Sequence, residues 1–279
     1  GMLCYNCGRS LSEHDFCTSC GADVSIYKKI MHLSNRFYND GLEKAQVRDL
    51  TGAINSLRQS LKLNKNNIKA RNLLGLVYFE MGEVVAALSE WVISKNIRPK
   101  KNIADMYINM IQTNQSRLDS INQTIKKYNQ ALTYCRQDSQ DLAVIQLKKV
   151  LSLNPKFVRA HQLLALLYIE AGEWEKARKE LYKCGRIDSN NTTTRRYLNG
   201  SRFGIRLVSD RPQFFIHSYL RHLDSCRKDE KPGRCQPYYD TNRHIDKNGD
   251  SFSFLPVHRL DDCLVAALVF DSIRAGSYG

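Results

Sequence analysis

The sequence predicts an all-α protein, in which helical hairpins stack into a superhelix behind a small metal-binding segment at the N-terminus. Three observations lead to this prediction. Apolar residues recur with helical periodicity through the middle of the chain. That middle part matches itself at an offset of 90 residues. Four cysteines lie within the first twenty residues as two Cys-x2-Cys pairs.

The N-terminal segment, residues 2–24, carries the strongest chemical signal. Its cysteines are Cys4, Cys7, Cys17 and Cys20, and a glycine follows each pair. Two thiolates at this spacing can bind one metal ion from a tight turn, and two such turns complete a tetrahedral site. About twenty residues cannot bury a core, so the metal would supply the folding free energy. We therefore expect a structural Zn²⁺ ion, with rubredoxin-like iron and a redox dithiol as alternatives.

The middle of the chain repeats with a period of 34 residues. The segment from Ala70, ARNLLGLVYFEMGEVVAALSE, matches the segment from Ala160, AHQLLALLYIEAGEWEKARKE. Repeats are assigned to 34–67, 68–101, 124–157 and 158–191. Their eighth and twentieth positions are always small, as expected where two helices of a hairpin touch: Gly41, Gly75, Ala131 and Ala165, then Ala53, Ala87, Ala143 and Ala177. The eleventh position holds a large ring in three repeats: Tyr78, Tyr134 and Tyr168.

This pattern resembles the tetratricopeptide repeat over residues 34–191, with one interruption. The second and fourth repeats match well. The first has Lys44 where a large aromatic residue is expected, and Lys65 where proline is expected. The cysteine segment separately resembles the short zinc ribbon at the start of many bacterial proteins. The resemblance implies a right-handed superhelix with a zinc module, acting as a non-enzymatic protein-interaction scaffold.

The resemblance also implies where a partner would bind. In tetratricopeptide arrays the first helix of each hairpin lines a concave groove that receives a peptide or a helix. The positions carried over by repeat phase are Tyr38, Leu42, Lys69, Asn72, Leu76, Phe79, Tyr128, Leu132, Arg159, Gln162 and Leu166. The lining is largely apolar, which suits an amphipathic helix. The carboxylate-clamping pattern of chaperone-binding members is not reproduced.

Residues 102–123 interrupt the repeat phase. No glycine or proline occurs between Lys100 and Asn154, so residues 103–136 are expected to form one helix of about 50 Å. The alternative is two helices that meet near Asn114. Apolar residues form a heptad-like stripe over 104–135, which would either be the seam of a homodimer or pack onto the chain's own repeats. A further alternative is that the insert itself fills part of the concave groove, where a partner would otherwise bind.

The chain changes character after the repeats. We expect a capping helix over 192–209, because repeat arrays need a polar terminal cap. Residues 210–279 contain four of the six prolines and continue no repeat. They are predicted to be irregular or partly disordered, with a short helix at 260–273.

Charge and cysteine usage leave two other readings open. The net charge of +14 allows a nucleic-acid-binding adaptor that uses the zinc ribbon and the basic surface. The likeness to zinc-ribbon proteins with a membrane segment allows a membrane-proximal assembly factor, although no apolar run here is long enough to span a bilayer. The remaining cysteines are scattered, which is typical of the reducing cytoplasm: Cys135, Cys184, Cys226, Cys235 and Cys263.

No catalytic constellation is visible, and we expect the protein not to be an enzyme. His161 falls at the fourth position of the last repeat, where a packing role is expected. The group His217, His222, Cys226 and Cys235 matches no strong metal-binding spacing.

Overall fold

The computed structural model describes residues 2–202, 216 and 219–220. Within them the chain is helical, with two isolated β-bridges in the N-terminal segment. The ten helices are α1 (Ser25–Gln46), α2 (Leu50–Leu63), α3 (Ile68–Glu80), α4 (Val84–Ile97), α5 (Ala104–Gln112), α6 (Gln115–Arg136), α7 (Gln140–Leu153), α8 (Val158–Glu170), α9 (Trp174–Ile187) and α10 (Thr192–Arg202). The expected helix at 260–273, the part of the capping segment beyond 202 and nearly all of the expected tail lie outside the described residues.

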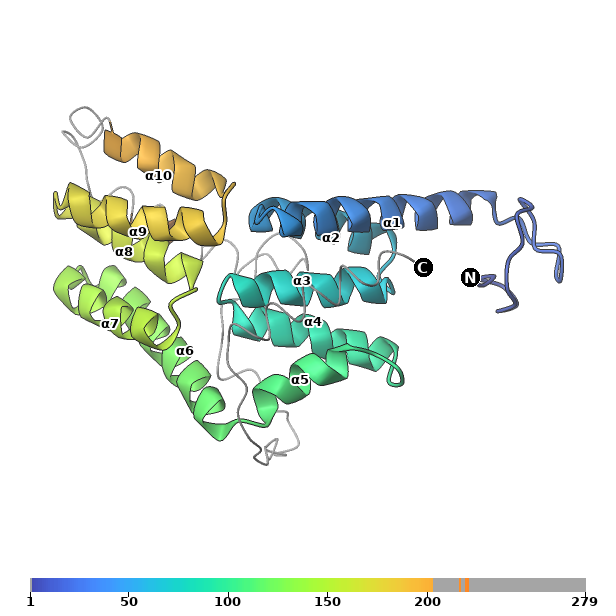
Figure 1. Cartoon of the computed structure of the whole chain (residues 1–279), viewed down its shortest axis with the longest axis horizontal. Helices are drawn as coiled ribbons and strands as arrows, with labels where there is room; N and C mark the ends of the chain where they lie inside the picture. Colours follow the sequence, from blue (N-terminus) through green and yellow to red (C-terminus); the bar gives the residue numbers. More distant parts are fainter. Residues whose placement is uncertain (1, 203–215, 217–218, 221–279) are drawn as a thin grey trace.

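Eight of these helices form four hairpins (Figure 1). The pairs are α1 with α2, α3 with α4, α6 with α7, and α8 with α9, and each pair is joined by a turn of three residues. The single helix α5 continues the first two hairpins, and α10 continues the last two. The expected all-α hairpin architecture is confirmed.

The small residues of the repeat lie where the helices of a hairpin touch. All four alanines at the twentieth position are fully buried. A β-carbon on Gly75 would lie 2.3 Å from Nε1 of Trp91, and one on Gly41 would lie 2.7 Å from Cγ of Leu57. Since Trp91 is itself fully buried, the ring of α4 fits only against a glycine on α3.

The turn inside each hairpin needs one residue with a positive φ angle. Gly82 and Gly172 fill this position in the second and fourth hairpins, with φ of 75° and 74°. In the first and third hairpins the same position holds Arg48 (φ 59°) and Asp138 (φ 54°). Left-handed backbone is unfavourable for residues with a β-carbon, so the two weaker repeats carry local strain that the stronger two avoid.

The first hairpin replaces the aromatic residue of the repeat with a polar network. Nζ of Lys44 lies 2.6 Å from Asp40 and 2.9 Å from the hydroxyl of Ser56, and that hydroxyl also donates to Asp40. These bonds join α1 to α2 across the space that Tyr78 and Tyr168 fill in their hairpins. A hydrogen-bonded cation therefore substitutes for a ring.

The insert does not form one long helix, contrary to the continuous reading of 103–136. The chain breaks at Thr113 and Asn114, between α5 and α6. The side chain of Asn114 accepts a hydrogen bond from the backbone N–H of Arg117 at 3.0 Å, and the Thr113 hydroxyl donates to the carbonyl of Asn109 at 2.7 Å. Such side-chain bonds compete with the helical ladder, so two polar residues suffice to end one helix and start another.

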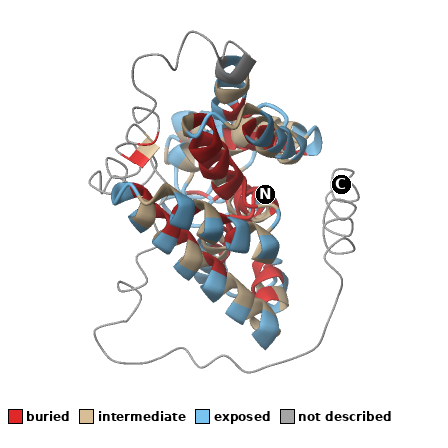
Figure 2. Ribbon diagram, turned by 90° about the vertical axis from the view of Figure 1, so that its left-hand side faces the viewer, coloured by how far each residue is buried: buried red, intermediate tan, exposed pale blue. Residues whose placement is uncertain are grey.

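The break turns the second half of the molecule back against the first. Figure 1 shows α1–α5 and α6–α10 as two stacks joined at a V between α5 and α6. Each stack has its own core, and Val158 and Cys184 of the second half pack into the core of the first. Buried residues gather where the helices face one another, and exposed ones cover the outside (Figure 2).

Turns of the first half meet chain segments of the second at this junction. The backbone N–H of Val158 donates to the carbonyl of Met81 at 3.2 Å, and the side-chain amide of Asn154 donates to the carbonyl of Gly82 at 2.9 Å. Arg159 pairs with Glu83 at 2.7 Å, and Glu83 is 2 % exposed. The two halves are therefore held together by backbone bonds and a largely buried ion pair.

Candidate metal centre and concave face

The four N-terminal cysteines converge on one point. Their sulfur atoms all lie within 4.8 Å of one another, with Sγ–Sγ distances of 3.8 Å between Cys4 and Cys20 and 3.7 Å between Cys7 and Cys17. These separations are far longer than a disulfide bond of about 2.05 Å, and all four thiols are free. The arrangement can hold a single metal ion.

Two equivalent turns build this cluster, 13 residues apart in the sequence. Cys4 donates its backbone N–H to the carbonyl of Arg9, and Cys17 donates in the same way to Ala22, both at 2.8 Å. Gly8 and Gly21 close the turns with φ of 71° and 75°, which a glycine adopts without strain. The repeat of the sequence motif is thus also a repeat of the backbone.

Polar groups around two of the sulfurs favour the thiolate. Backbone N–H of Ala22 and the side-chain amide of Asn6 donate toward the sulfur of Cys20 and lower the pKa of that thiol to about 6. The backbone N–H of Ser19 likewise lowers the pKa of Cys17. Cys7 differs: a backbone bond from Arg9 acts to lower its pKa, but burial and the neighbouring cysteine side chains raise that pKa to about 11. The thiolate is the form that binds metal, and the surroundings favour it at Cys17 and Cys20.

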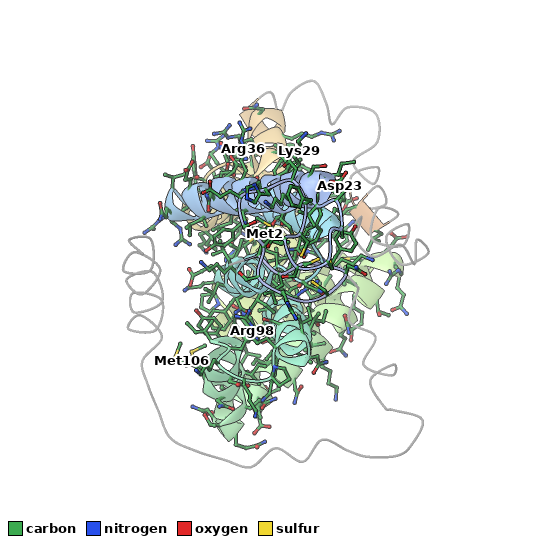
Figure 3. All side chains as sticks on the ribbon, turned by 90° about the vertical axis from the view of Figure 1, so that its right-hand side faces the viewer. Met2, Asp23, Lys29, Arg36, Arg98 and Met106 are labelled. Atoms are coloured by element: carbon green, nitrogen blue, oxygen red, sulfur yellow. The ribbon has the colours of Figure 1, made fainter. Side chains whose placement is uncertain are left out.

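The cysteine cluster is attached to the outer end of α1. Nζ of Lys28 donates to the carbonyl of His14 at 2.6 Å, and the rings of Tyr5 and Tyr27 meet edge to face with centroids 5.6 Å apart. Beyond Ser34, which bonds to Ser60 of α2, the first turns of α1 project toward this module (Figure 1). Figure 3 views the molecule from that end and labels Met2 and Asp23 of this module.

The apolar groove positions expected in the first half share one degree of exposure. Tyr38, Leu42, Leu76 and Phe79 are all half-buried, and all four pack against the first core. Lys69 is exposed. This face of α1 and α3 is apolar and only partly covered by the described residues.

Two expected groove positions are engaged inside the chain. The amide of Asn72 donates to Oδ1 of Asn102 at 2.9 Å, just before α5. The amide of Gln162 donates to Oδ1 of Asn191 at 3.1 Å, just before α10. In both halves the fifth repeat position thus binds the asparagine that starts the next helix, an arrangement that stacks the helices.

The matching positions of the second half are covered. Tyr128, Leu132 and Leu166 are buried, and Arg159 is half-buried beside Glu83. Ile216 and Leu220, which lie far along the chain, belong to the same core as these residues.

Comparison with protein-family models shows which repeat this is. A model described as "TPR repeat" matches residues 49–82, and one described as "Tetratricopeptide repeat" matches residues 126–183. These segments are tetratricopeptide repeats. A search of curated proteins gives no match.

Among solved structures, this tetratricopeptide protein is similar to MamA. One MamA structure shares 17 % identity, with a TM-score of 0.28, and covers 73 % of this chain and 98 % of its own. A second shares 18 % identity with a TM-score of 0.28, over 66 % of this chain and 94 % of that one. A third, titled MamA AMB-1, shares 18 % with a TM-score of 0.26, over 68 % and 92 %.

His161 has a packing environment in the tetratricopeptide array. Its two ring nitrogens lie 2.5 Å from the carboxylate of Glu180 and 2.8 Å from the carbonyl of Pro155, and the side chain is buried. Burial alone would raise the pKa of Glu180, but His161 and Lys183 outweigh it and hold that pKa below its usual value.

Sequence reasoning missed three features. Asn67, Asn102 and Asn191 lie just before α3, α5 and α10, and their side chains are hydrogen-bonded to the preceding hairpin. Asparagine stands at the last position of the first and fourth repeats and one residue past the second, which was a readable signal. The left-handed role of Arg48 and Asp138 was readable from the glycines at the same repeat position. The contact made by Ile216 and Leu220 had no such signal.

Among the described residues, no helix combines the length and the apolar character that crossing a membrane requires.

Proposed function

We propose that this tetratricopeptide protein is a non-enzymatic scaffold that binds an amphipathic helix of a partner protein on the concave face of its first half. One observation supports this most: Tyr38, Leu42, Leu76 and Phe79 form an apolar face that is half-buried, whereas the matching face of the second half is buried. A partly covered apolar strip on two parallel first helices is the kind of surface that receives a helix.

The proposed cofactor is a structural Zn²⁺ ion at Cys4, Cys7, Cys17 and Cys20. Zinc–sulfur bonds are about 2.3 Å long, so tetrahedral sulfurs lie about 3.8 Å apart. The observed 3.7 and 3.8 Å fit this spacing. Four thiolates close the coordination shell, which favours a structural role. Thiols that must stay reduced for this purpose suit the cytoplasm, where we place the protein.

The heptad stripe does not favour the homodimer considered from the sequence. Four residues of this stripe are already buried inside a single chain and are not available as the seam of a dimer: Tyr107, Ile111, Leu132 and Cys135. Tyr107 and Ile111 pack in the core of the first half, and Leu132 and Cys135 pack in the core of the second.

The test compares full-length proteins in affinity capture from a lysate of the source organism. The groove variant is Leu42→Glu with Leu76→Glu. The matched control is Leu142→Glu with Ile145→Glu, which places the same charges on exposed apolar residues of α7. We expect proteins retained by the wild type and the control to be lost with the groove variant, whose far-UV circular dichroism stays helical.

Nuclease treatment and a salt series complete the experiment. Proteins retained equally by the groove variant would contradict the proposal. Co-purifying nucleic acid, lost steeply as salt rises, would instead support the adaptor that the net charge of +14 allows.

A further inference from the structure

Three residues near the C-terminal end of the described chain share one face. Ile216, Tyr219 and Leu220 have helical backbone, and residues spaced i, i+3 and i+4 point to the same side of a helix. Ile216 and Leu220 are each only 4 % exposed, and Tyr219 packs beside them. All three contact the core of the second half. They therefore present a continuous apolar surface to the repeats.

The surface they contact is the one that repeat phase assigns to ligand binding. The hydroxyl of Tyr219 lies 3.1 Å from the hydroxyl of Tyr128, a groove position on α6. The ring of Tyr128 packs on Phe157 with centroids 4.8 Å apart. Burial raises the pKa of Tyr219 to about 12, and the nearby charge of Arg159, a groove position on α8, acts against this rise. Tyr219 thus lies against first helices of two successive hairpins.

The two halves offer a comparison within one molecule. Positions five and nine of the first hairpin are the half-buried Tyr38 and Leu42. The same positions of the third hairpin are Tyr128 and Leu132, which are 4 % and 0 % exposed. Residue types are identical at both positions, so the difference lies in what covers them. Ile216, Tyr219 and Leu220 are members of the cluster that buries the second pair.

We propose that Ile216, Tyr219 and Leu220 form an intramolecular ligand of the second concave face. A partner helix binds there only by displacing it. This deepens the proposed function and rests on it in one respect, that these faces bind helices of other proteins. The competing helix must present an apolar residue at i, tyrosine at i+3 and an apolar residue at i+4. Tyrosine is preferred because its hydroxyl reaches that of Tyr128.

A peptide with the sequence of residues 212–224, labelled with fluorescein, tests the displacement by fluorescence anisotropy. The proteins are the full-length wild type and the full-length variant Ile216→Asp with Leu220→Asp. In the wild type the attached segment competes with the peptide, which reduces its apparent affinity by the fraction of open sites. We expect the variant to bind the peptide at least about ten-fold more tightly than the wild type does.

Three controls make the peptide result specific. Leu142→Asp with Ile145→Asp puts equal charge on exposed residues of α7 and should bind like the wild type. A peptide with aspartate at the three contact positions should not bind. Adding Tyr128→Ala to the double variant should abolish the gain. Equal affinity of wild type and double variant, or no binding to either, would overturn the proposal.

Hydrogen exchange of the unmodified full chain gives a test that needs no variant. Backbone amides of Ile216, Tyr219 and Leu220 should exchange at least about ten-fold more slowly than in the free peptide, because a docked residue must open before it exchanges. Exchange at the rate of the free peptide would overturn the intramolecular ligand. The capture experiment with Leu42→Glu and Leu76→Glu would still test the proposed scaffold. If exchange is slow but the groove variant of the capture experiment retains the same proteins as the wild type, the intramolecular ligand is supported and the proposed scaffold is contradicted.

Discussion

Asp188, which follows α9, accepts a hydrogen bond from the backbone N–H of Leu50, the first residue of α2, at 3.0 Å. The same carboxylate accepts from the N–H of Thr51 at 3.3 Å and from the amide of Asn191 at 3.0 Å, and Asp188 is fully buried. A residue of the last hairpin thus caps a helix of the first, 138 positions earlier in the chain. Helix N-termini carry unpaired N–H groups, and here a distant half of the molecule supplies the acceptor.

The first prediction concerns this long-range cap. Asp188→Ala leaves buried N–H groups of α2 without an acceptor, so we expect a loss of about 1–3 kcal/mol in the free energy of unfolding. The matched control is Asp49→Ala, which removes only the local cap on Gly52 and should cost about 1 kcal/mol. Urea denaturation of both variants measures the difference. Equal losses would mean that the junction adds nothing beyond a local cap.

The second prediction concerns the contact between α3 and α4. Gly75→Ala places a β-carbon 2.3 Å from Nε1 of Trp91, which donates to the carbonyl of Asn72 at 3.1 Å. Overpacking costs about 1–3 kcal/mol, more than the gain of up to about 1 kcal/mol in helix propensity. We expect a lower melting temperature, measured by circular dichroism.

Gly185→Ala is the control for that change. Gly185 lies inside α9 with nothing within 4 Å of an added β-carbon. The same substitution should therefore stabilise the protein by about 0.5–1 kcal/mol. Destabilisation of both variants would argue that glycine is needed for a reason other than the Trp91 contact.

The third prediction separates the metal centre from the array. Cys17→Ser, or chelation of the wild type, should remove the bound metal and unfold residues 2–24, because their buried cluster contains little more than Cys4, Cys17 and Val24. The hairpins have cores of their own and should melt at the wild-type temperature. Metal content is measured by mass spectrometry and helix content by circular dichroism. A shared loss of helix at one temperature would show that the module and array fold as one unit.

The fourth prediction concerns the pH dependence of stability. Burial, aided by the charge of Asp138, raises the pKa of Glu170 to about 7 from an ordinary 4.5. A raised carboxyl pKa means that the folded state holds the proton more tightly than the unfolded state does. Its stabilising contribution is complete below pH 4.5 and is lost as pH rises toward about 7. Glu170→Gln should remove this decline from the melting temperature.

An exposed carboxyl provides the comparison for Glu170. Glu175 on α9 is 75 % exposed, and Glu175→Gln should keep the wild-type pH profile. Melting temperatures of the three proteins between pH 4.5 and 8 measure the effect. A Glu170→Gln profile parallel to that of the wild type would assign the decline to another group.

Local features of this fold could be read from the sequence, whereas the way its parts meet could not. The small residues at Gly75 and Ala87 predict a hairpin because two helices touch at a fixed spacing, and the cysteine spacing predicts a metal centre for a similarly local reason. The direction in which the second half turns depends on the break at Asn114, and the heptad stripe without proline left both one continuous helix and two helices open. Contacts such as that of Asp188 with Leu50 join residues far apart in the sequence. No repeat period predicts that two such residues meet.

The junction between the halves also determines where this chain tolerates added length. A β-carbon on Gly82 would lie 2.6 Å from the Cα of Phe157, and Arg48 donates to the carbonyl of Ile187 at 3.1 Å, so the turns of the first two hairpins are enclosed by the second half. Gly172, in the turn of the fourth hairpin, has no atom of the described residues within 4 Å of an added β-carbon. Insertions, epitope tags and protease sites should therefore be accommodated at the α8–α9 turn and rejected at the α3–α4 turn, although the two turns belong to equivalent positions of one repeat.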